Sequence, residues 1–231
     1  IAFSQIMGTG IEYEYEGKIY HFNKAIMDDY DRTISALSNK GMTVKVIILN
    51  DWNPNRPDLI YPGTKKSSNA FYYMFNGANE AGFEQTRAIA AFLADHYSGK
   101  DSNHGKVSNW IIGNEINNQQ WNYMGSMDLT NYVKVYQQAF RIFYTAIKST
   151  NANDRVYFSL DYNWMNEIDG KLKYGGKEIV DSFNSIANVQ GQMDWGLAYH
   201  PYPCPMIEPE FWDDPKATGL FTNDFNSPVI N

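Results

Sequence analysis

The sequence lacks the features that mark disulfide-stabilised, nucleic-acid-binding and membrane-spanning proteins. Its 231 residues contain one cysteine, Cys204, so no disulfide can form within the chain. Lys and Arg total 19 against 26 Asp and Glu, a net charge of −7. We therefore do not expect the basic face that nucleic-acid binding normally requires. No run of 18 apolar residues is present either, so we expect no membrane span.

Motifs for nucleotide or metal chemistry are also missing. No Gly-rich phosphate loop follows any apolar segment. The four histidines lie apart in the sequence without His-Glu-x-x-His spacing, so we expect no catalytic metal and no cofactor. Aromatic residues, in contrast, make up 16% of the chain. Tyr and Trp offer apolar faces on which sugar rings stack, although a Tyr-rich core would give the same composition.

The hydrophobic pattern predicts alternating helices and strands. Apolar residues at three- and four-residue steps predict helices over about 24–40, 82–97, 128–149 and 177–188. Short continuous apolar runs predict strands over 44–49, 110–112, 156–160 and 195–199. Such runs are typical of strands that are covered on both faces, and the alternation with helices favours a parallel sheet.

The arrangement of polar residues favours a closed α/β barrel over an open sheet. Polar residues follow each predicted strand, as expected if they form one rim at the carboxyl end of a (β/α)8 TIM barrel. Residues 2–6 and 227–231 read as parts of an earlier and a later strand, which gives about six strands. We therefore expect a single incomplete barrel domain over 1–231 that lacks the first strand or so and the final βα units. Alternating residues over 11–22 predict a small antiparallel hairpin that decorates the rim.

Glu115 is the candidate general acid/base. It ends the segment Trp110-Ile111-Ile112-Gly113-Asn114-Glu115, which places its carboxyl group at the rim. If Trp110, Trp121 and Tyr123 wall it, its pKa could be raised enough for it to act as a general acid. A loop or helix-capping carboxylate would give the same two-residue signal. The candidate substrate-binding residues on the rim are Asn114, Asp51, Trp52, Trp121, Asp161, Trp164, His200 and Tyr202.

The same segment resembles the clan A glycoside hydrolases, whose barrels carry Asn-Glu at the end of the fourth strand. The resemblance implies that Glu115 is the acid/base and that Asn114 contacts the sugar 2-hydroxyl. Residues 195–202, Trp-Gly-Leu-Ala-Tyr-His-Pro-Tyr, resemble the clan's sixth strand, which often ends in an aromatic residue or His near the substrate. More narrowly, residues 13–23 and 41–44 resemble an uncharacterised bacterial family of glycosidase-like barrels, catalogued as a domain of unknown function.

The resemblance also implies a second carboxylate that the sequence does not identify. Retaining members use a nucleophile at the end of strand seven, and the chain stops at Asn231, within or just before that position. Either the nucleophile follows Asn231 or the barrel lacks it. Asp51, Asp161 and Glu167 are possible substitutes without a supporting motif.

Three functions remain open at this point. The first is a glycoside hydrolase that acts on an oligo- or polysaccharide, retaining if strand seven supplies the nucleophile, although the fragment alone could be inactive. The second is a non-catalytic barrel that binds carbohydrate through its aromatic rim. The third is a scaffold barrel without a sugar ligand, because fold does not fix function. From the resemblance alone, we expect an extracellular or cell-surface location.

Overall fold

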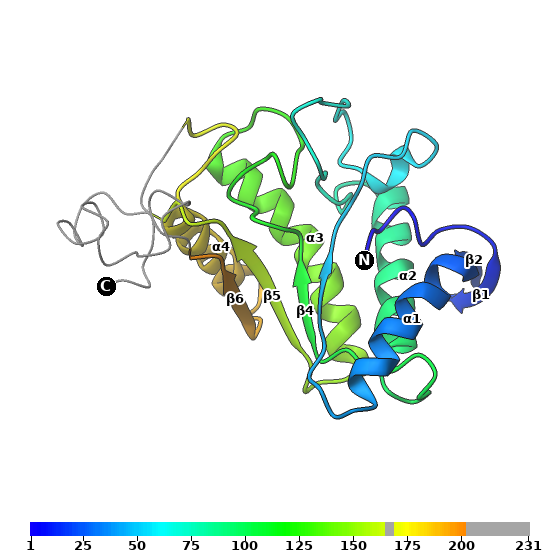
Figure 1. The fold of residues 1–231 in the computed structure, drawn as a ribbon. Coiled ribbons are helices and arrows are strands. Elements are labelled where there is room, and N and C mark those ends of the chain that lie inside the picture. Colours follow the sequence, from blue (N-terminus) through cyan, green and yellow to red (C-terminus); the bar gives the residue numbers. More distant parts are fainter. Residues whose placement is uncertain (165–168, 202–231) are drawn as a thin grey trace.

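The protein has a mixed α/β fold, shown as a computed structural model in Figure 1. The structure describes residues 1–164 and 169–201. The elements follow one another as β1 (Gly10–Tyr15), β2 (Lys18–Asn23), α1 (Lys24–Ser38), β3 (Lys45–Ile48), the 3-10 helix η1 (Pro57–Leu59), α2 (Glu80–His96), β4 (Asn109–Ile112), α3 (Leu129–Thr150), β5 (Arg155–Leu160), α4 (Gly176–Gln190) and β6 (Trp195–Tyr199).

The centre of the fold is a parallel sheet in the order β3-β4-β5-β6, as the sequence predicts. Helices α3 and α4 pass behind the sheet in Figure 1, with α2 packed beside α3, and cover one of the two faces to which successive strand residues alternate. In β3, β4 and β5 this helix-covered face is apolar and buried, and it carries Val46, Ile48, Trp110, Ile112, Val156, Phe158 and Leu160. Burial of these side chains against the helices is what fixes the register of the sheet.

The opposite face of the sheet, which we call the open face, is only partly covered. Ile47, Ile111 and Tyr157 are half-buried there. The Tyr157 ring lies against Gly196 of the next strand, where an added Cβ would come within 2.4 Å of ring atoms. Its hydroxyl donates to Asn109 Oδ1 at 3.0 Å.

The helices begin where side-chain caps are available. Asn23 accepts a hydrogen bond from the Ile26 amide at the start of α1, and Asp128 caps α3 by accepting from the Asn131 amide. Helix α2 begins at Glu80, two residues before its predicted start at Gly82, because Asn79 caps it by accepting from the Gly82 amide at 2.9 Å. In the described residues, no helix is long and apolar enough to cross a membrane.

The β1–β2 hairpin forms as predicted but does not lie on the rim. Its two-residue turn has positive φ at Glu16 and Gly17, as a type I′ turn requires. Its apolar residues pack on the flank of α2, with Tyr13 at 5.4 Å and Phe22 at 3.6 Å between ring centroids from Phe92. The rim placement was wrong because these aromatic side chains need an apolar surface, which α2 provides and solvated loops do not.

The N-terminal segment extends the sheet beside β3. Ala2 and Leu49 form a parallel bridge, and Phe3 donates its amide to the Leu49 carbonyl at 2.7 Å. This fits the expectation that residues 2–6 contain the tail of an earlier strand. The later strand predicted over 227–231 lies outside the described residues.

Candidate functional site

The segment after β4 turns sharply at Gly113 and presents Glu115 at the carboxyl end of the sheet. Gly113 has φ 75° and Glu115 has φ 41°, so both adopt the left-handed conformation. Glycine adopts it freely, whereas a residue with a Cβ does so at a cost of roughly 1–2 kcal/mol. The Glu115 amide is held by the Ser159 hydroxyl of β5, which accepts at 2.8 Å. Uncommon backbone conformations of this kind cluster at functional sites.

Two tyrosines of helix α3 form hydrogen bonds to the backbone on either side of the Gly113–Glu115 turn. The Tyr136 hydroxyl donates to the Ile112 carbonyl at 2.5 Å, just before the turn. The Tyr132 hydroxyl donates to the Ile116 carbonyl at 2.6 Å, just after it. Burial raises the pKa of both Tyr132 and Tyr136, so both remain protonated donors. The turn that carries Glu115 is therefore fixed at both of its ends.

The carboxylate of Glu115 meets His200, which directly follows β6. Its Oε1 lies 2.8 Å from His200 Nδ1, and both side chains are largely buried, with 14% and 25% exposed. The His200 amide donates to the Leu160 carbonyl at 3.0 Å, which extends the β5–β6 pairing and places the imidazole. The structure thus brings together two predicted site residues that are 85 positions apart. A carboxyl group beside an imidazole can accept and donate protons.

Comparison with known proteins gives a family and no curated relative. A model described as "Family of unknown function (DUF5722)" matches residues 1–231. The chain belongs to this DUF5722 family. No curated protein matches it.

In this DUF5722 chain, both described candidates for a second carboxylate are engaged in hydrogen bonds. Asp51 accepts from the amide and the hydroxyl of Ser4, at 3.2 and 2.9 Å. Asp161 is buried and accepts from the side chains of Asn117 and Asn163 and from the Asn163 amide. These contacts give each carboxylate a role in holding loops. Glu167, the third candidate, lies outside the described residues.

The three predicted rim tryptophans each pack on another aromatic residue. Trp52 lies 5.1 Å from Tyr73 and Trp164 lies 5.8 Å from Tyr199, measured between ring centroids. Trp121 stacks on Phe71 at 4.8 Å, and the Phe71 ring is exposed. Each tryptophan is half-buried and keeps part of its surface open to solvent. Asn114 is also half-buried, next to Glu115, and Tyr202 lies outside the described residues.

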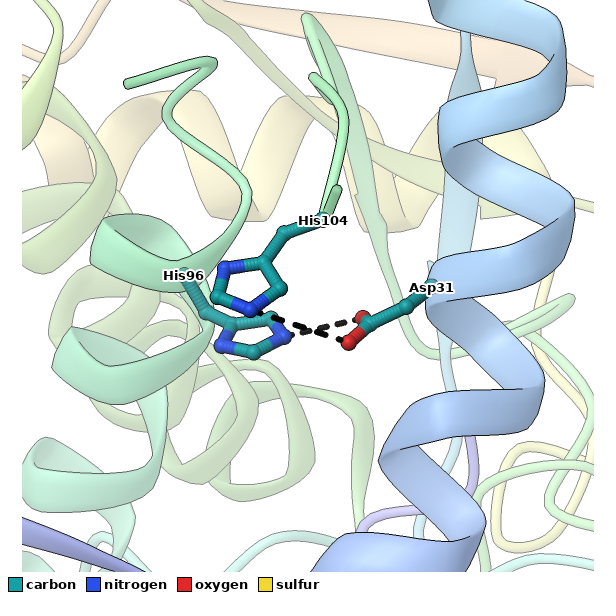
Figure 2. A group of neighbouring side chains, drawn as sticks. All are labelled: Asp31, His96 and His104. Atoms are coloured by element: carbon teal, nitrogen blue, oxygen red, sulfur yellow. Dashed lines mark hydrogen bonds and ion pairs between the residues drawn. The ribbon is translucent and has the colours of Figure 1, made fainter. Parts of the chain in front are cut away.

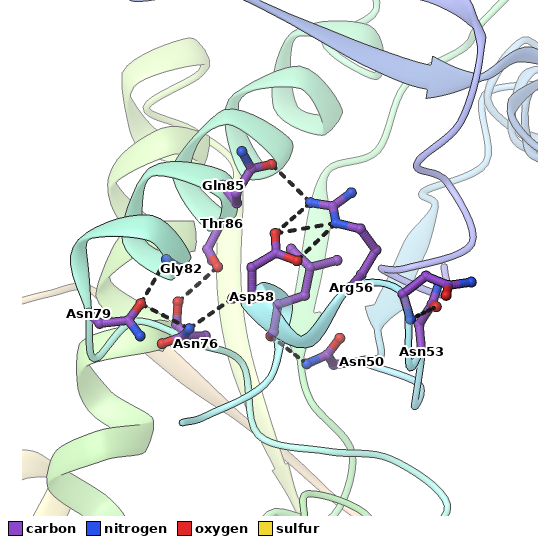
Figure 3. Close-up of polar contacts among 11 residues, drawn as sticks. Asn50, Asn53, Arg56, Asp58, Asn76, Asn79, Gly82, Gln85 and Thr86 are labelled. Carbon is purple, nitrogen blue, oxygen red and sulfur yellow. Dashed lines mark hydrogen bonds and ion pairs between the residues drawn. The ribbon is translucent and has the colours of Figure 1, made fainter. Parts of the chain in front are cut away.

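The long loop between β3 and α2 is held in place by polar side chains (Figure 3). Asn50, the second residue after β3, is buried and donates to the Leu59 carbonyl at 2.9 Å. Arg56 binds Asp58 in a bidentate pair and reaches Gln85 of α2 at 3.0 Å. The loop next to the rim is therefore a fixed part of the fold.

The sequence interpretation missed the residues that hold Glu115 and misplaced one of its neighbours. Ser159 and the α3 tyrosines were read only as parts of a strand and a helix, although a serine within an apolar strand is a recognisable polar interruption. Trp110 does not wall Glu115. It belongs to the helix-covered face, and its indole N–H donates to Asp154 at 3.2 Å. Trp110 lies within β4 and is buried against the helices, whereas Glu115 comes after the turn at Gly113 that ends the strand.

A cleft of about 790 Å³ lies elsewhere, between the hairpin and helices α2 and α3. It is lined by Tyr13, Tyr15 and Arg141, among others, and by none of the predicted site residues. We therefore do not connect it with Glu115.

Proposed function

We propose that the chain forms most of a (β/α)8-barrel glycoside hydrolase domain. The sequential parallel order of β3 to β6 with helices on one face supports a barrel, as does the parallel pairing of the N-terminal segment with β3. The half-buried open face supports it further, because closure by additional strands would cover that face. Glu115 follows the strand that would be the fourth, as the clan A resemblance requires.

In this proposal Glu115 is the general acid/base. Protonated Glu115 donates its proton to the glycosidic oxygen as the bond to the anomeric carbon breaks, and the resulting carboxylate later takes a proton from water. His200 orients the Glu115 carboxyl group through the 2.8 Å contact. The observation that carries the proposal is this one: a carboxylate on left-handed backbone at a strand end, held by groups from α3, β5 and the end of β6.

The nucleophile of a retaining mechanism would come from the barrel strand after β6. A retaining pair needs its two carboxyl groups about 5–5.5 Å apart. Among the described residues, Asp51 and Asp161 are committed to loop contacts, so neither is our candidate.

The test compares Glu115→Gln with the wild-type protein on paired aryl glycosides with good and poor leaving groups. We expect the variant to lose about 10²- to 10⁴-fold in turnover, the usual contribution of general acid–base catalysis. The loss of rate in the glycosylation step should be larger for the substrate with the poor leaving group, because departure of its more basic oxygen depends more strongly on protonation. Glu178→Gln, an exposed position in the first turn of α4, is the matched control and should retain full activity.

Two outcomes would decide against this assignment. Full turnover by the Glu115→Gln variant would show that Glu115 is not the acid/base. If the wild-type protein binds oligosaccharides but hydrolyses none of a broad panel, the protein is a non-catalytic carbohydrate-binding barrel.

A further inference from the structure

Asp31, His96 and His104 come from three separate segments and converge on one point, although the histidines lie apart in the sequence (Figure 2). Asp31 belongs to α1, His96 ends α2, and His104 lies in the loop that leads to β4. The two imidazole rings stack with centroids 3.7 Å apart and an angle of 17° between their planes. Both rings direct Nε2 toward the Asp31 carboxylate.

The candidate ligand atoms all lie within 4.8 Å of one another, which is close to the spacing that a zinc site requires. His96 Nε2 lies 2.9 Å from Asp31 Oδ1, and His104 Nε2 lies 3.9 Å from Asp31 Oδ2. Ligands about 2.0–2.1 Å from a tetrahedral Zn²⁺ are about 3.3 Å from one another, a value between these two distances. Small side-chain rotations would therefore bring all three residues into the coordination sphere.

The loop that carries His104 is already fixed against α1 by other contacts. The Ser38 hydroxyl accepts from the Lys106 amide at 3.0 Å, and the Asn39 side chain donates to the Ser102 carbonyl at 2.9 Å. Gly105 lies so close to α1 that an added Cβ would be 2.7 Å from Ser35 backbone atoms. The three candidate ligands are thus held near one another by the fold, which lowers the entropic cost of binding an ion.

An ion pair alone explains the arrangement less well. The two imidazole rings stack at 3.7 Å and both direct Nε2 toward the one Asp31 carboxylate, so an ion pair with either histidine leaves the position of the other unexplained. A neutral imidazole offers a nitrogen lone pair, which is the form that binds a metal. His96 and Asp31 have side chains only 8% and 13% exposed, while His104 is 34% exposed and leaves a path for an ion to enter.

We propose that Asp31, His96 and His104 bind one Zn²⁺ ion, with water or Asp101 as a fourth ligand. The Asp101 carboxylate lies 4.0 Å from His104 Nε2. The site is at the amino end of β4, whereas Glu115 follows its carboxyl end. The ion is therefore structural: it fastens α1 to the end of α2, and it takes no part in chemistry at Glu115.

The test uses the whole chain without a histidine tag. Bound metal is first removed with a chelator. The affinity for Zn²⁺ is then measured by competition with a chromophoric chelator, and the amount of Zn²⁺ bound per chain is measured after desalting. We expect one Zn²⁺ per chain and a rise in melting temperature on binding. His104→Gln keeps a polar side chain of similar length but is a poor ligand. It should weaken Zn²⁺ binding by more than about tenfold, since loss of even an outer-shell partner costs 10- to 100-fold.

His21→Gln is the matched control, because His21 lies exposed on the hairpin with its Nδ1 3.9 Å from Glu12. It should bind Zn²⁺ like the wild-type protein. Asp31→Asn provides a second loss-of-ligand variant, with folding of all variants checked by circular dichroism. The proposal is overturned if the wild-type chain retains no Zn²⁺, or if folded His104→Gln and His21→Gln bind it equally well.

Discussion

From the left-handed backbone of Glu115 we predict an effect on the free energy of unfolding that does not depend on catalysis. We compare Glu115→Gly with Glu115→Ala, both of which lose the contact with His200 equally. At φ 41° alanine pays roughly 1–2 kcal/mol for its Cβ, while glycine pays no such cost but loses more chain entropy on folding. The net expectation is that the glycine variant is more stable by about 1 kcal/mol, contrary to the usual order.

Urea denaturation and calorimetry can measure this difference. For a chain of this size, 1 kcal/mol corresponds to about 2–4 °C in melting temperature. The control is the same pair of substitutions at Asp28, an exposed position within α1 whose ion pair with Lys24 both variants lose. There the alanine variant should be more stable than the glycine variant by about 1 kcal/mol. If alanine is as stable as glycine at position 115, the backbone there is not strained and the reasoning fails.

Two further changes test other parts of the fold. Gly196→Ala places a methyl group 2.4 Å from the Tyr157 ring and should destabilise the protein by about 1–3 kcal/mol in urea denaturation. Unchanged stability would show that the ring moves away freely. Burial raises the pKa of Asp154, against an opposing hydrogen bond from Trp110. The contribution of Asp154 to the free energy of unfolding is therefore fully present below its ordinary pKa of 3.8. It is lost as the pH rises through the raised pKa of the folded state, because the buried carboxyl group must then ionise. Asp154→Asn should match the wild type below pH 3.8 and exceed it in unfolding free energy at higher pH. A pH-independent difference would contradict this.

The sequence predicted the helices and strands of the described residues because burial leaves a clear periodic pattern. Strand residues such as Val46 and Ile48 are apolar because helices cover them, and the caps at Asn23 and Asp128 are visible as residue types. The start of α2 was predicted less accurately, because the capping Asn79 is one of several polar residues just before the helix.

The site was predictable only in part. The position of Glu115 after a strand could be inferred, and parallel pairing explains why His200 comes near it. The left-handed conformation of Glu115 could not be inferred, because non-glycine residues rarely adopt it. The meeting of His96 and His104 with Asp31 could not be inferred either. It depends on how α1 packs against the end of α2, and no local pattern encodes that packing.

The two hydroxyl contacts from α3 determine which parts of the molecule control the Glu115 turn. Because Tyr136 and Tyr132 donate to the carbonyls of Ile112 and Ile116, respectively, the turn follows the position of a helix that comes later in the sequence. Transplanting residues 110–117 into another scaffold would therefore leave the turn without its supports. A designer who wishes to reposition Glu115 has better control through the packing of α3 than through the strand that carries it.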